Sequence, residues 1–212
     1  MMVITWLGHS SFLIEGSSGK KIITDPFNGT VGYKLYESDA DVVTISHNHF
    51  DHNYTEKIKG NPRIISVIGS FDLEDIKIKG IKSYHDNVMG SKRGDNIIYI
   101  IEMDGYRLCH LGDLGYVLDS AAIKELGLID VLFIPVGGNY TLDNQEASEL
   151  AKLIKSHIVI PMHYKTTFIS FPISGMENFL LNMKNCEKIT DNLKLESKLM
   201  EYNIVKILPY NN

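Results

Sequence analysis

Residues 41–52 read DVVTISHNHFDH. The apolar run at 41–46 predicts a buried β-strand, and this strand leads directly into His47, His49, Asp51 and His52. Three imidazoles and a carboxylate at this spacing are typical of sites that hold metal ions with nitrogen and oxygen ligands. Such sites commonly activate water, so the segment indicates hydrolytic chemistry.

The spacing within the cluster favours two neighbouring ions over one. His47 and His49 are two positions apart, which places both on the same side of an extended segment. Asp51 and His52 are adjacent, so they are expected to point apart. The alternative interpretation is a surface loop that happens to be rich in histidine, and four ligand-type side chains directly after a buried strand argue against it.

The rest of the chain predicts a layered α/β protein with two sheets inside and helices outside. No linker or low-complexity tract divides it, so we expect one domain over residues 1–212. An Asp-Gly pair at 104–105 predicts a hairpin turn. Strands are predicted at 3–7, 11–15, 21–24, 41–46, 63–67, 76–84, 96–102, 106–111, 131–136, 157–161 and 202–208, and helices at 120–126, 143–155 and 175–184.

Composition excludes several classes of protein. The net charge of −5 and the absence of a long Lys/Arg run argue against nucleic-acid binding. No apolar stretch reaches the roughly 18 to 20 residues of a membrane span, and the N-terminus lacks the features of a signal peptide. We therefore expect a cytoplasmic protein without membrane contact, in which Cys109 and Cys186 are free thiols.

Two metal ions need more ligands than the cluster provides, because a catalytic zinc ion has three protein ligands and an open position. Four further candidates stand at the ends of predicted strands: His85, His110, Asp113 and His163. Strands that deliver His or Asp at the same end build a site at one edge of a sheet sandwich.

Six motifs follow one another along most of the chain: WLGHSSFLIE (6–15), TDPF (24–27), SHNHFDH (46–52), HLGDLG (110–115), PVGGNYTLD (135–143) and PMHYKT (161–166). With these motifs the chain resembles the metallo-β-lactamase superfamily, especially its stand-alone bacterial and archaeal branch related to L-ascorbate-6-phosphate lactonase. The resemblance implies a four-layer αβ/βα sandwich.

The resemblance also implies a ligand set of seven residues. The first ion is held by His47, His49 and His85, the second by Asp51, His52 and His163, and Asp113 bridges the two. Nitrogen and oxygen ligands favour zinc and also suit manganese, iron, cobalt or nickel. His110 is the alternative to His85 at the first ion, and the family pattern favours His85.

Four residues are candidates for positions beside the ligands or the substrate: His9, Asp25, His110 and Tyr164. The alternative for His9 is a turn residue bonded to nearby backbone. The alternative for Asp25, which precedes a proline, is the cap of a turn. Tyr164 is a candidate for lining the substrate pocket.

We therefore expect a dinuclear metal-dependent hydrolase of a small ester, lactone or phosphorylated metabolite. In this hypothesis a metal-bound hydroxide attacks the substrate, and Asp51 places the water or takes its proton. A non-catalytic metal-binding sensor or assembly component is the second hypothesis, and a metal-dependent nuclease or phosphodiesterase ranks last. The apolar segment 166–173 leaves a homo-oligomer open.

Overall fold

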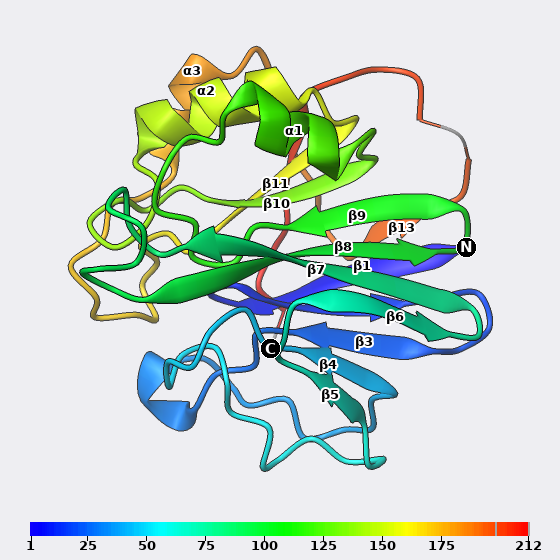
Figure 1. The fold of residues 1–212 in the computed structure, drawn as a ribbon. Helices are drawn as coiled ribbons and strands as arrows, with labels where there is room; N and C mark the ends of the chain where they lie inside the picture. The colour runs from blue at the N-terminus through cyan, green and yellow to red at the C-terminus, as the bar shows by residue number, and fades with distance from the viewer. Residues whose placement is uncertain (198, 212) are drawn as a thin grey trace.

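Two β-sheets form the centre of the computed structural model, which describes residues 1–197 and 199–211 (Figure 1). The first sheet has six strands in the order β13-β1-β2-β3-β4-β5. Its strands are β1 (Met2–Gly8), β2 (Ser11–Glu15), β3 (Lys21–Thr24), β4 (Val42–Thr44), β5 (Arg63–Ile65) and β13 (Leu193–Leu195).

The second sheet has eight strands in the order β12-β14-β11-β10-β9-β8-β7-β6. From β9 to β12 along this order the strands are parallel, and from β6 to β9 they are antiparallel. Its strands are β6 (Gly69–Leu73), β7 (Ile76–Tyr84), β8 (Asp95–Met103), β9 (Tyr106–His110), β10 (Val131–Pro135), β11 (Ile158–Met162), β12 (Asn185–Lys188) and β14 (Ile204–Ile207).

The described residues form three α-helices, which gather on the outer side of the eight-stranded sheet (Figure 1). They are α1 (Ser120–Leu126), α2 (Asn144–Ile154) and α3 (Glu177–Asn182). Asp143 caps α2 by accepting hydrogen bonds from two backbone N–H groups, and Glu146 bonds back to the Asp143 backbone. Strands β10 and β11 are buried at every position, as expected for parallel strands that are covered on both faces.

The core lies between the sheets, and a second apolar layer covers the outer face of the six-stranded sheet. Ile22 and Val42 belong to the main core, whereas the next residues on the same strands, Ile23 and Val43, pack in the second layer. This alternation follows from the two faces of a strand. The other residues of the second layer also lie outside the α-helices. The connection between β3 and β4 contains the short 3-10 helix η1 (Gly29–Val31).

The predicted α/β sandwich is therefore confirmed, with one difference in its outer layers. Every strand and helix predicted from the sequence is present, and the ends differ by a few residues. Three strands were missed, β6, β12 and β13, because they are short or carry mostly exposed polar residues. Within the described residues the α-helices cover one sheet, and irregular chain takes the place of helices on the other.

Both cysteines are free, with Cys109 buried and Cys186 exposed, as predicted. Across the described residues, no helix combines the length and the apolar character that crossing a bilayer would require.

Candidate metal centre

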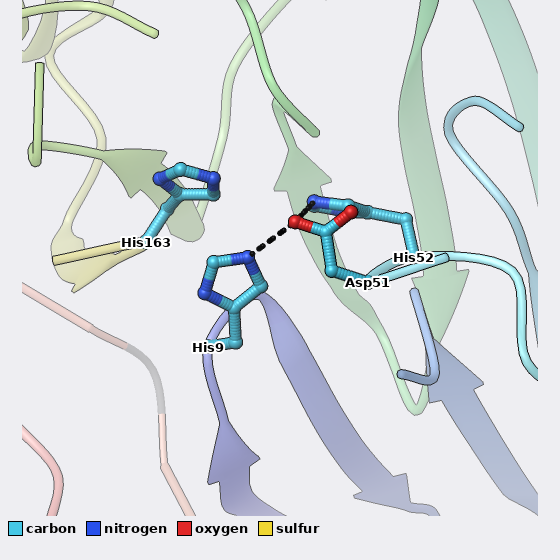
Figure 2. A group of neighbouring side chains, drawn as sticks. All are labelled: His9, Asp51, His52 and His163. Carbon is cyan, nitrogen blue, oxygen red and sulfur yellow. Dashed lines mark hydrogen bonds and ion pairs between the residues drawn. The ribbon is translucent and has the colours of Figure 1, made fainter. Parts of the chain in front are cut away.

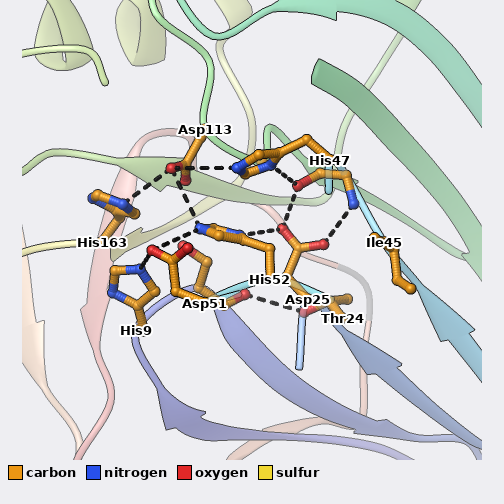
Figure 3. Close-up of polar contacts among 12 residues, drawn as sticks. His9, Thr24, Asp25, Ile45, His47, Asp51, His52, Asp113 and His163 are labelled. Carbon is orange, nitrogen blue, oxygen red and sulfur yellow. Dashed lines mark hydrogen bonds and ion pairs between the residues drawn. The ribbon is translucent and has the colours of Figure 1, made fainter. Parts of the chain in front are cut away.

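The candidate ligands meet at one edge of the sandwich, where several strands end. Figure 3 shows His47, Asp51, His52, Asp113 and His163 among them. The cluster that begins at His47 follows β4, His85 follows β7, Asp113 follows β9, and His163 follows β11. Strands β7, β9 and β11 run in the same direction, so their carboxyl ends lie at the same edge of the sheet. The cluster that begins at His47 comes from the six-stranded sheet, because it follows β4, and it lies beside these strand ends.

The side chains form three overlapping groups in which nitrogen or carboxylate oxygen atoms lie within 4.8 Å of one another. His47, His49 and His85 make the first group. The second group combines His9, Asp51, His52 and His163, which converge from three separate segments (Figure 2). The third group is His47, His52 and Asp113, and it joins one member of each of the other two.

Several histidines converge on Asp113, and Figure 3 shows its contacts with His47, His52 and His163. Its Oδ2 atom is 3.1 Å from Nε2 of His163, 3.2 Å from Nε2 of His85 and 3.3 Å from Nε2 of His52. Nε2 of His47 lies 3.9 Å away. One carboxylate therefore faces four imidazoles.

Hydrogen bonds on the outer side orient two of the histidines. Nδ1 of His52 lies 2.9 Å from the Asp25 carboxylate, and Nδ1 of His47 lies 3.0 Å from the Ser46 hydroxyl. The Ser46 hydroxyl in turn donates to Asp25 at 2.5 Å. Because Nδ1 is used in this way, Nε2 of each ring is free to face the centre, as metal-binding histidines require.

His85 and His110 differ in whether one ring nitrogen remains free to face the centre. Nδ1 of His85 lies 3.1 Å from the Tyr140 carbonyl, and its Nε2 faces Asp113. His110 has no nitrogen to spare, because Nε2 lies 2.8 Å from the Ser10 carbonyl and Nδ1 accepts from the Gly112 N–H at 3.2 Å. The structure thus brings His85 into the cluster and leaves His110 behind it, bonded to backbone.

His9 is more central than the sequence indicated. It is fully buried, its Nε2 lies 3.2 Å from Oδ2 of Asp51, and its ring centroid lies 4.2 Å from that of His163. Its φ of 52° is in the left-handed region, as are φ of 40° at Asp25 and 52° at His163. Such backbone is uncommon outside glycine and is concentrated at functional sites.

Two expectations are wrong in detail. Asp51 and His52 do not point apart, because residues 50–52 form a turn instead of an extended segment, and the side chains approach to 3.6 Å. Tyr164 does not line the pocket described below. It is 5% exposed and stacks on Trp6 with ring centroids 5.4 Å apart.

The unpaired atoms at this centre fit divalent cations. Buried polar atoms nearly always have a hydrogen-bond partner, yet several here have none among the described residues. A cation would satisfy lone pairs on such nitrogen and oxygen atoms. These atoms are Nδ1 of His9 and His163, Nε2 of His47 and His52, and Oδ1 of Asp113.

The electrostatic environment without cations differs between the proposed ligands. Burial acts to lower the pKa of His52 and His85, but the neighbouring Asp113 outweighs it and raises both, whereas His47 and Asp113 are held in their metal-binding forms. Burial, together with the charge of His52, lowers the pKa of His47 to about 3, so its imidazole is neutral at neutral pH. Burial acts to raise the pKa of Asp113, but the neighbouring His163 and His52 outweigh it and hold that pKa well below its usual range. Neutral imidazole and ionised carboxylate are the forms that bind metal.

A cavity of about 640 Å³ opens onto the centre. This size is within the range of small-molecule pockets. The sequence did not predict the roles of Ser46 or of the cationic residues at the mouth of the cavity. Ser46 belongs to the SHNHFDH motif, which is the signal that could have identified it. The cavity is lined by Asn48, His49, Phe50, Asp51, His85, Lys92, Arg93, Asp113, Tyr140, His163 and Phe171.

Comparison with known proteins agrees with this fold and identifies metal-dependent hydrolases as relatives. The family model described as the beta-lactamase superfamily domain matches residues 3–163. The UPF0173 metal-dependent hydrolase of Pelotomaculum thermopropionicum is 34% identical over 196 residues, which cover 78% of this chain and 85% of that protein. The corresponding protein of Thermococcus onnurineus is 32% identical over 196 residues, with 78% and 86% covered.

A solved structure from Thermotoga maritima is 40% identical, with a TM-score of 0.83, and covers 98% of this chain and 99% of its own. Its description proposes a zinc-dependent hydrolase of the metallo-β-lactamase superfamily. The chain thus belongs to the metallo-β-lactamase superfamily. Within it, the chain is a member of the UPF0173 metal-dependent hydrolases.

Proposed function

We propose that this metal-dependent hydrolase is a dinuclear enzyme that holds two divalent ions, with zinc as the first candidate. The observation that carries the proposal is the third ligand group, in which Asp113 lies with one histidine from each of the other two groups. A single carboxylate between two cations offsets their mutual repulsion. The proposed first site is His47, His49 and His85, and the proposed second site is Asp51, His52 and His163, with Asp113 shared.

The ions, when bound, would supply an activated water and positive charge for the oxygen atom that becomes negative during hydrolysis. Other side chains of the protein orient the ligands that would hold these ions. Asp25 and Ser46 hold the rings of His52 and His47, and His9 holds the Asp51 carboxylate at 3.2 Å. Asp51 lines the cavity, and in this proposal its carboxylate places the attacking water or takes its proton.

The proposed substrates are small esters, lactones or phosphorylated metabolites. The cavity of about 640 Å³ suits a small molecule, and the net charge of −5 opposes binding to a polyanion. A small-molecule partner and no nucleic acid are therefore part of the proposal.

The test compares His49→Ala and Asp113→Ala with the control His157→Ala, whose ring lies away from the centre and stacks on Tyr202. Metal content by elemental analysis and hydrolysis of an ester and lactone panel are measured on each purified variant. We expect both site variants to lose metal and turnover and the control to keep both. Normal metal loading with full activity in His49→Ala and Asp113→Ala would overturn the proposal.

A further inference from the structure

The connection between β7 and β8 contributes two residues to the lining of the cavity, Lys92 and Arg93. We call residues 86–94 the Asp86 loop. It begins directly after His85, and it returns to the same place, because the His85 N–H donates to the Gly94 carbonyl at 3.1 Å. The loop is therefore anchored at both ends beside a proposed metal ligand.

The carboxylate of Asp86 organises this loop from within. Oδ1 accepts hydrogen bonds from the backbone N–H groups of Val88 and Gly90, each at 2.9 Å. Oδ2 accepts from those of Lys92 at 2.9 Å and Arg93 at 2.8 Å. Four bonds to one carboxylate restrict the backbone that carries the two cationic side chains. They also lower the pKa of Asp86 to about 2, against the effect of burial, so the carboxylate is ionised at neutral pH.

Lys92 and Arg93 both line the cavity. Arg93 donates from Nη2 to the Asn139 carbonyl at 2.8 Å, and its guanidinium lies 5.6 Å from the ring centroid of Tyr140. The carbonyl of Tyr140 is the group that orients His85. The guanidinium is thus held beside the metal centre with further N–H donors to spare.

Neither cation is neutralised by the protein. In the described part of the chain, no carboxylate lies within 4.0 Å of the charged groups of Lys92 or Arg93. The two carboxylates that line the cavity are Asp51 and Asp113, and both are engaged with the histidine cluster. Two cationic residues therefore line the cavity without an acidic partner among the described residues.

We propose that Lys92 and Arg93 form a recognition site for an oxyanionic group of the substrate, a carboxylate or a phosphate monoester. The inference rests on the proposed hydrolase function and narrows its substrates to anionic esters and lactones. A planar guanidinium beside an ammonium group suits either oxyanion. The rigid Asp86 loop reduces the entropy lost when the two side chains engage the substrate.

The first test measures binding to the metal-loaded protein by calorimetry with three related probes: phenylphosphonate, benzoate and neutral benzamide. Lys92→Gln and Arg93→Gln should each weaken binding of the preferred anion about tenfold and leave benzamide unchanged. Tighter binding of phenylphosphonate than of benzoate identifies a phosphorylated substrate, and the reverse order a carboxylated one. Metal content is measured on each variant, so that a lost ion is not mistaken for a lost contact.

The control is Lys82→Gln, which removes a positive charge nearby that does not line this cavity and pairs with Asp95 at 3.6 Å. It should bind each probe within about twofold of the wild type, because exposed charges are screened. Anion binding that is unchanged in Lys92→Gln and Arg93→Gln, or reduced equally in Lys82→Gln, overturns the inference.

The second test compares hydrolysis of mono-4-nitrophenyl succinate, which carries a carboxylate, with that of neutral 4-nitrophenyl acetate. Arg93→Gln should lower kcat/KM for the succinate ester about tenfold more than kcat/KM for the acetate ester. If neither ester is hydrolysed while anion binding still depends on Lys92 and Arg93, the proposed function fails and the anion site stands. Equal loss on both esters would contradict the anion site.

Discussion

Hydrogen bonding decides which histidines of this protein are available as ligands. His85 and His110 are both buried, and both stand at strand ends that lead to the cluster. His85 uses one nitrogen on a backbone carbonyl and directs the other to Asp113, whereas both nitrogens of His110 are occupied by backbone groups. Burial and position in the chain are alike, so only the partners of each nitrogen separate the two residues.

This difference predicts opposite results for two alanine variants. His85→Ala should lower metal affinity by more than about 100-fold, beyond the loss caused by removing an outer partner. His110→Ala should keep metal but lose about 1–3 kcal/mol of unfolding free energy, because the Ser10 carbonyl loses its donor. Chelator competition and urea denaturation measure the two effects. Loss of metal from His110→Ala with retention in His85→Ala would reverse the proposed roles.

Close contacts between elements position the end of β11. The loop after β10 passes so near the turn at His163 that a Cβ atom on Gly137 would lie 2.1 Å from the His163 carbonyl oxygen. His163 itself has a left-handed φ of 52°, and its N–H donates to the His9 carbonyl at 3.2 Å. The backbone conformations around His9, Gly137 and His163 thus depend on one another.

Gly137→Ala should therefore disturb His163 without removing any ligand. We expect a loss of about 1–3 kcal/mol in unfolding free energy, as for an overpacked core, and weaker metal binding. Gly29→Ala is the matched control, since its Cβ would meet nothing within 4 Å, and it should stay within about 0.5 kcal/mol of the wild type. Equal stability and metal affinity in the two variants would show that the close approach has no consequence.

The whole molecule places its proposed ligands on both sheets. The cluster that begins at His47 follows a strand of the six-stranded sheet, and His85, Asp113 and His163 follow strands of the eight-stranded sheet. Without cations, the unpaired buried atoms at this edge disfavour the folded state. Metal binding is thereby coupled to the stability of the sandwich.

Metal removal should consequently lower the melting temperature. With free metal at 1,000 times the dissociation constant, binding adds about 4 kcal/mol, which for a chain of this size is a shift on the order of 10 °C. Calorimetric melts of metal-loaded and chelator-treated protein measure it. Asp113→Ala should show a much smaller difference between the two melts. Coincident melts of loaded and metal-free wild type would contradict this coupling.

Local patterns in the sequence were sufficient for most of the elements and for much of the centre. Apolar runs predicted the strands, and ligand-type residues at their ends predicted the cluster, because both signals are carried by neighbouring residues. The place of His9 within the histidine cluster could not be predicted, since its contact with Asp51 joins residues 42 positions apart. The burial of Tyr164 against Trp6 likewise depends on packing between distant segments.

The sequence by itself determined the superfamily, the α/β sandwich and the types of ligand available to a metal. The tertiary structure alone decided that His85 and not His110 faces Asp113. It also decided that Lys92 and Arg93 reach the cavity with no acidic partner in the part of the chain that the structure describes. The physical reason is that nitrogen direction and charge pairing depend on atoms brought together by folding, such as the Tyr140 and Ser10 carbonyls. Every residue has such a carbonyl, so the sequence carries no mark of which one is used.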